Sequence, residues 1–222
     1  MAERTAAAPP TWRQRQAAET KRQIVRAARR LFVVSGYAGT TVEQIAAEAG
    51  VAVATVYKAF GTKAAIARDL NDLIDEEAGT AALAGQIQSE TDPARLIGLV
   101  VAQLRTQHES CGDIIAAIRS GAAVDATLAE VWAEGTRRYD DGMRNLIGKL
   151  KADGALRPGL DDAQAAGLAS VLCSTEAFTG LTTRHGWTAS QWDTWTTSAL
   201  RQLLLHEAPG NTPGRSGSAQ RQ

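Results

Sequence analysis

The 222-residue sequence predicts an all-α protein of about nine helices. Its six prolines stand in a few places, and the stretches between them are rich in Ala, Leu, Arg, Glu and Gln, which favour helices. Apolar residues recur at helical spacing within these stretches. No stretch alternates between apolar and polar residues as strands do, so we expect essentially no β-sheet.

The first helix is expected from about Gln16 to Ser35, where apolar residues recur at helical spacing, and Gly36 is expected to end it. Residues 1–15 are expected to form a flexible arm, and three of its basic residues suit contact with phosphates or the minor groove of DNA: Arg4, Arg13 and Arg15. Ordinary surface polarity is the alternative for these arginines. Residues 209–222 are rich in Pro, Gly and Ser and are expected to be a flexible tail.

Two short helices are expected next, at 42–49 and 52–59, joined by a tight turn at Gly50. Thr41 and Gln44 have the spacing of a capping box at the start of the first. Such a pair is typical of a helix-turn-helix, whose second helix enters the major groove of DNA. A helical hairpin with a purely structural role is the alternative. Thr62 is expected to cap a long helix that begins near Lys63.

The remaining chain is expected to form five helices, at about 92–109, 112–120, 124–152, 161–184 and 188–206. Asp92 before Pro93 is a cap followed by proline at the first helical position. Thr188 and Gln191 form a second capping box. We therefore divide the chain into the arm, a helix-turn-helix domain at 16–65, a helical domain at 66–208 and the tail.

The charges are unevenly distributed although the net charge is zero. Residues 1–70 carry eleven Lys and Arg against five Asp and Glu, so the rest of the chain has an acidic excess of six. A basic segment at residues 1–70, followed by an acidic body at residues 71–222, suggests that only the first segment contacts a polyanion. Chance clustering on a solvated helix face is the alternative, and a basic stripe along the whole chain, as an architectural DNA-binding protein would need, is missing.

Other classes of protein find little support. No apolar run reaches the roughly 20 residues of a membrane-spanning helix, and the first residues do not read as a secretory signal. Cys111 and Cys173 lie far apart, which favours a reduced, cytoplasmic setting. There is no phosphate-binding loop, dinucleotide fingerprint, nucleophile elbow or metal-ligand spacing, so we expect no enzyme, no cofactor and no metal.

Three side chains around the helix pair suit contact with phosphate groups, which fix the register of a protein on DNA. Thr41 offers a hydroxyl at a helix start, and Tyr57 offers a phenolic donor on the outer side of its helix. Lys63 stands in the first turn of a helix, where a cation opposes the helix dipole unless an anion is bound there.

Residues 22–70 resemble the DNA-binding domain of the tetracycline-repressor (TetR) family. The matching stretches are ARRLFVVSGYAGTTVEQIAAEAGVA, TVYKAF and GTKAAIARDL. The resemblance implies a homodimer that binds a palindromic operator, usually as a repressor, with Thr41, Tyr57 and Lys63 on phosphates. The base-facing positions would be Ala52, Val53, Ala54, Thr55 and Lys58. Ala59 and Ala64 depart from the family pattern, and Lys58 is the strongest donor to guanine on this helix.

The resemblance also implies a small-molecule effector for the domain at 66–208, and dimer formation through the last two helices. The ligand site is expected between the middle helices, lined by apolar side chains with a few polar anchors. Its candidate residues, each of which can also be plain core, are Leu99, Leu104, His108, Ile115, Trp132, Tyr139, Met143, Leu172, Glu176 and Phe178. A ligand-independent or architectural DNA-binding protein is the alternative function.

Overall fold

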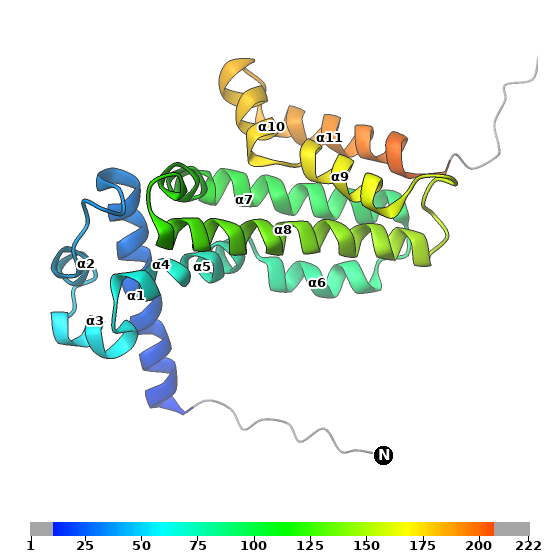
Figure 1. Ribbon diagram of the computed structural model, residues 1–222. Coiled ribbons are helices and arrows are strands. Elements are labelled where there is room, and N and C mark those ends of the chain that lie inside the picture. Colours follow the sequence, from blue (N-terminus) through cyan, green and yellow to red (C-terminus); the bar gives the residue numbers. More distant parts are fainter. Residues whose placement is uncertain (1–10, 207–222) are drawn as a thin grey trace, which may run out of the picture.

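The computed structural model describes residues 11–206, and these form an all-helical molecule (Figure 1). The first helices are α1 (Trp12–Ser35), α2 (Val42–Glu48), α3 (Val53–Phe60), α4 (Lys63–Arg68), α5 (Leu70–Glu77) and α6 (Thr80–Ser89). The later ones are α7 (Pro93–Ala122), α8 (Ala126–Ala152), α9 (Asp162–Leu172), α10 (Thr175–Thr179), the π-helical turn η1 (Gly180–Arg184) and α11 (Ala189–Leu204). The all-α prediction is confirmed, and the one β-bridge of residues 11–206 is isolated, between Leu156 and Leu205.

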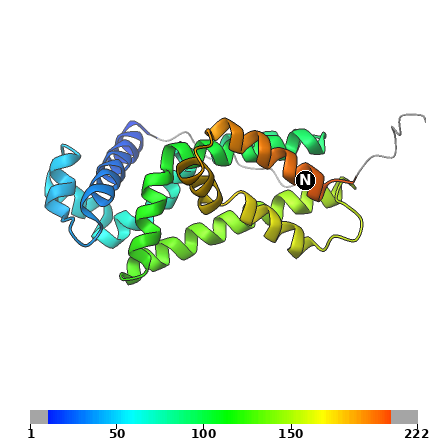
Figure 2. The ribbon, with the colours of Figure 1, turned by 90° about the horizontal axis from the view of Figure 1, so that it is seen from above.

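The long helices α7 and α8 lie side by side along the molecule, and α9 and α11 cover one side of them (Figures 1 and 2). The first three helices lie at one end of this bundle. Two apolar cores result. The first joins α1–α5 to the adjoining ends of α7 and α8, and the second joins the remainder of α7 and α8 to α9 and α11. The helix-turn-helix thus shares its core with the body.

The first helix begins at Trp12, earlier than the expected Gln16. Thr11 explains this, because its hydroxyl accepts a hydrogen bond from the Gln14 amide while the Gln14 side chain accepts one from the Thr11 amide. The prediction that Arg13 and Arg15 stand on a flexible arm is therefore wrong, since both lie on α1. Arg4 and the expected tail lie outside the described residues.

Three other helix bounds differ from the prediction. The expected helices at 92–109 and 112–120 are one helix, α7, which continues through Gly112, since a single glycine costs a helix only about 1 kcal/mol. The expected long helix from Lys63 is divided, and Gly79, with a φ of 71°, stands in the left-handed conformation between α5 and α6. The expected helix at 161–184 breaks at Cys173, and Ser174 caps α10.

Among residues 11–206, no helix is long and apolar enough to span a membrane. The same residues bring no three potential metal ligands together.

Candidate nucleic-acid interface

The helix pair is held by a small apolar core against α1. Ile45 of α2 is fully buried, and Val56 of α3 is 1% exposed. Between the two helices Gly50 has a φ of 67°, and the Val51 amide donates to the Ala46 carbonyl at 3.0 Å. The turn therefore needs a residue that tolerates the left-handed region, as the sequence predicts for Gly50.

One face of α3 is turned away from this core. Ala54, Tyr57 and Lys58 are exposed, and their spacing of three and four residues places them on the same side of the helix. Tyr57 is 49% exposed although it is a large aromatic residue. Within residues 11–206, neither the Tyr57 hydroxyl nor the Lys58 ammonium has a hydrogen-bond or ion-pair partner. Of the other base-facing candidates, Ala52 is exposed, and Val53 and Thr55 are half-buried.

Thr41 is the exposed N-cap of α2, and the predicted capping box is present. Its hydroxyl oxygen accepts from the Gln44 amide at 3.2 Å, and its own amide donates to the Gln44 side chain at 2.8 Å. The hydroxyl proton is not used in either bond, so it is free to donate to an anion outside the helix.

Lys63 is placed differently from a free surface cation. Its ammonium donates to the carbonyls of Tyr37 at 2.7 Å and of Thr40 at 2.8 Å. It also lies 4.2 Å from the centre of the Tyr37 ring, a cation–π contact. The unfavourable position of a cation at a helix start is thereby compensated. Lys63 holds the α1–α2 turn against α4, and only one of its three N–H donors is left for a phosphate.

Four arginines of α1 are paired with acidic side chains, three of them with residues of α5 and α7 and the fourth with a residue of α2. Arg22 pairs with Glu76 at 3.2 Å, Arg26 with Glu77 at 3.7 Å, and Arg30 with Glu48 at 2.6 Å. Arg29 pairs with Glu77 and with Asp113, and donates to the Ser110 carbonyl. Composition alone could not reveal this, because the acidic partners come from distant parts of the chain.

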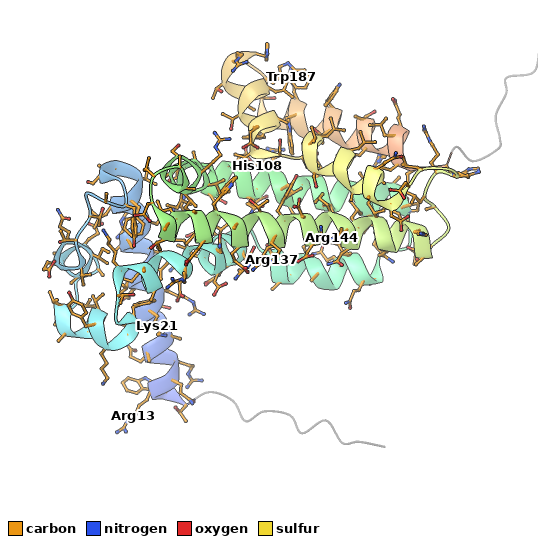
Figure 3. All side chains as sticks on the ribbon, viewed as in Figure 1. Arg13, Lys21, His108, Arg137, Arg144 and Trp187 are labelled. Carbon is orange, nitrogen blue, oxygen red and sulfur yellow. The ribbon has the colours of Figure 1, made fainter. Side chains whose placement is uncertain are left out.

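A smaller set of cations remains for a polyanion. Arg13, Arg15 and Lys58 have no acidic partner within residues 11–206, and Lys21 lies 5.3 Å from the centre of the Phe60 ring. Arg13 and Lys21 lie along the end of α1 that points away from the body (Figure 3). The Lys21–Phe60 contact joins this end of α1 to the last residue of α3. Within the helix-turn-helix end of the molecule, the positive charge without an acidic partner therefore includes α3 and the nearby end of α1.

The expected ligand residues do not form one pocket. Leu104, His108, Tyr139, Met143, Leu172 and Phe178 pack together in the second core. Trp132 and Ile115 belong to the first core. Glu176 is on the surface and pairs with Arg119. Two concavities of residues 11–206 are an open groove along the start of α1 and a void of about 10 Å³ beside Phe32, and none of the candidates lines either.

Tyr139 and His108 of the second core find hydrogen-bond partners inside the protein. The Tyr139 hydroxyl donates to the Ser170 carbonyl at 2.6 Å, and burial raises the pKa of this phenol. Burial also raises the pKa of the Cys173 thiol to about 12, which keeps it protonated. His108 is 6% exposed, and its Nε2 lies 2.9 Å from the Cys173 carbonyl. Because a carbonyl only accepts, Nε2 carries the proton in the neutral ring.

His108 makes stability depend on pH. Burial lowers its pKa from 6.5, although the hydrogen bond to Cys173 and the charge of Glu176 oppose this. The unfolded chain therefore takes up the proton first as the pH falls, so this contribution is complete above the unfolded pKa and is lost below it.

We expect the free energy of unfolding, measured with urea, to fall between about pH 7.5 and 5.5 more steeply for the native chain than for His108→Gln. The glutamine keeps an N–H that can reach the Cys173 carbonyl but does not titrate. An equal fall in both proteins would assign the pH dependence to other groups.

A short helix pair packed on a long first helix, with the second of the pair exposed on one face, defines a helix-turn-helix protein. Residues 24–70 match the family model described as bacterial regulatory proteins, tetR family. This match covers about a fifth of the chain, and it confirms the resemblance seen in the sequence for these residues.

A curated relative, the HTH-type transcriptional regulator TtgR of Pseudomonas putida, is 38% identical over 78 residues. That match covers 35% of this chain and 37% of the relative, so it spans little more than a third of the length of the relative.

Solved structures extend the similarity in fold to most of the chain. The fatty acid degradation regulator FadR of Bacillus halodurans covers 82% of this chain and 94% of its own, with a TM-score of 0.67 and 21% identity. FadR of Bacillus subtilis, solved in complex with stearoyl-CoA, covers 82% and 97%, with a TM-score of 0.66 and 19% identity. At these identities the likeness concerns the fold alone.

Proposed function

We propose that this protein is a transcriptional regulator, most simply a repressor, that binds a palindromic DNA operator as a homodimer. The observation that carries the proposal is the exposed face of α3, where Ala54, Tyr57 and Lys58 stand without partners beside the unpaired cations of α1. In a helix-turn-helix this helix lies in the major groove, and the flanking polar groups bind phosphates. Thr41 and Tyr57 are proposed as phosphate contacts, and Lys63 supports the turn that carries Thr41.

The dimer is proposed to form through α9 and α11. Their exposed large apolar side chains are those that a partner would cover: Leu168, Val171, Trp195 and Leu203. Val171 is 69% exposed and Trp195 is 46% exposed, so both large apolar side chains face solvent in the single chain. A second copy packed on this surface would bury them in a four-helix arrangement.

The experiment that tests the function is selection of bound fragments from random and genomic DNA at a stated salt concentration. A dimeric regulator is expected to enrich a palindrome with half-site centres roughly 34–36 Å apart. Recovery of DNA without a shared sequence would support the architectural alternative instead.

Lys58→Ala is expected to relax the preference at one base position within each half-site, because lysine on a reading helix donates to the O6 and N7 atoms of guanine. A rough loss of 1–3 kcal/mol is expected for the preferred base. The measurement is the affinity for an operator series in which that base pair is varied. A uniform loss across the whole series would make Lys58 a phosphate contact.

An effector is proposed as the signal that releases the operator. It would bind more tightly to the conformation of the dimer in which the two copies of α3 are too far apart or too close for the operator. The dense packing of the candidate residues counts against a preformed pocket, so the ligand would have to open its own site. A regulator without a ligand is the alternative.

A further inference from the structure

Two polar groups on α11 are buried without a hydrogen-bond partner within residues 11–206: the indole Nε1 of Trp192 and the hydroxyl of Thr196. Both residues are 0% exposed. They stand four positions apart, so they occupy one face of the helix on successive turns. Burial without a partner forfeits the hydrogen bond that each group makes with water, and such groups are rare in folded proteins.

Thr196 also differs from several other threonines in helical segments. Thr106 donates to the carbonyl four residues earlier at 3.1 Å, and Thr182 does the same at 2.8 Å. This bond is the usual solution for a buried hydroxyl in a helix. The Thr196 hydroxyl does not make it, and remains available for another polar atom.

An aromatic wall surrounds Trp192. Its ring centre lies 5.5 Å from that of His108 and 5.2 Å from that of Phe178, with interplanar angles of 81° and 84°. The centres of His108 and Phe178 are 4.9 Å apart. Figure 3 shows His108 between the long helices and the layer that covers them. Trp192 thus meets both other rings edge to face, whereas His108 and Phe178 are tilted by 31° to each other, and together the three rings form a surface that suits another aromatic ring.

Phe178, the outer ring of this wall, stands on a short and irregular segment. Phe178 is half-buried, whereas His108 and Trp192 are buried. Phe178 lies on the five-residue helix α10, which the break after α9 precedes and the π-helical turn η1 follows. In Figure 1 this segment stands at the outside of the bundle. A one-turn helix between two irregularities is the easiest part of the wall to displace.

We propose that Trp192 and Thr196 form the polar end of a ligand site that opens when α10 moves Phe178 outward. The ligand class is a small neutral aromatic molecule with one hydrogen-bond acceptor, such as an aromatic ketone. Trp192 can only donate, so its partner must accept, and the Thr196 hydroxyl can donate to the same atom.

The ligand is expected to be neutral because of the charged side chains around the site. The nearby ionic groups are paired with each other, Arg105 with Asp193 and Arg119 with Glu176. The site thus offers a charged ligand no free counter-ion. Its role as an effector site rests on the proposed regulatory function, whereas the binding itself does not.

The test uses the full chain and two probes of matched shape, acetophenone and isopropylbenzene, which differ in the carbonyl acceptor. The side-chain N–H resonances of the tryptophans are followed in a ¹⁵N-labelled sample during titration, and Trp192→Phe assigns the resonance of Trp192. We expect acetophenone to move this resonance saturably and to bind at least about five-fold more tightly than isopropylbenzene, as one net hydrogen bond allows.

Thr196→Val and Trp192→Phe are each expected to weaken acetophenone roughly five-fold and to leave isopropylbenzene unchanged. Phe178→Ala, which removes the cover, is expected to bind both probes more tightly. The proposal is overturned if neither probe moves the Trp192 resonance, if both bind equally, or if this N–H is bonded to an internal water that no probe displaces. Operator binding by the same samples is measured separately. If the protein binds its operator but neither probe, this inference is refuted and the proposed function is not.

Discussion

Ile45→Ala is expected to lower the free energy of unfolding by about 2 to 5 kcal/mol, the largest effect of a single substitution in the helix-turn-helix. Ile45 is 0% exposed and packs in the core that joins α1, α2 and α3. Alanine removes most of this side chain and leaves a cavity that α2, a seven-residue helix, is too short to fill by moving as a unit. Urea denaturation followed by circular dichroism measures the change.

The matched control is Val34→Ala on α1. Val34 is 84% exposed, so this truncation is expected to change the same free energy by less than about 0.5 kcal/mol. If both variants lose the same small amount, α2 does not depend on the apolar core assigned to it.

Arg29→Ala is expected to lower the free energy of unfolding by about 2 to 3 kcal/mol. Burial opposes the charge of Arg29, but the hydrogen bond and charge of Asp113, together with Glu77, outweigh it and raise the pKa of the guanidinium. The Arg29 side chain is only 16% exposed. Its removal takes a donor from the Ser110 carbonyl and leaves Glu77 only its longer contacts with Arg26 and Cys111, at the junction between α1 and the body.

Arg30→Ala is the control for Arg29→Ala. It removes a neighbouring arginine whose pair with Glu48 is 56% and 40% exposed, and such surface pairs contribute roughly 0–1 kcal/mol. Equal losses for the two variants would mean that the Arg29 network does not fasten α1 to the body. Limited proteolysis of Arg29→Ala is expected to cleave more readily near that junction.

Local signals predicted the elements well. The capping residues Thr41, Asp92 and Thr188 stand where the sequence places them, because a cap needs only a few neighbouring residues. The helix-turn-helix could be predicted for the same reason: Gly50 and the apolar spacing around it lie within one short segment.

Features that depend on distant residues could not be predicted. The roles of Arg29 and Lys63 depend on partners far away in the chain, so charge counts along the sequence could not assign them. The break after α9 could not be predicted from the sequence either, because Cys173 and Ser174 do not prevent a helix. The expected ligand residues divide between two cores because helical spacing gives the face of one helix, but not the helix against which that face packs.

The proposal that α3 lies in a groove between two phosphate contacts is tested most directly by the operator affinity of Thr41→Asp combined with Tyr57→Phe. Aspartate keeps the cap of α2 and places a negative charge where a phosphate would lie, and phenylalanine removes the phenolic donor. Thr41→Asn is the control, because it keeps the cap without the charge.

We expect the double variant to bind the selected operator at least about a hundred-fold more weakly than the native protein at the same salt concentration, and Thr41→Asn to stay within about five-fold. An affinity of the double variant within about three-fold of the native value would contradict this placement of α3.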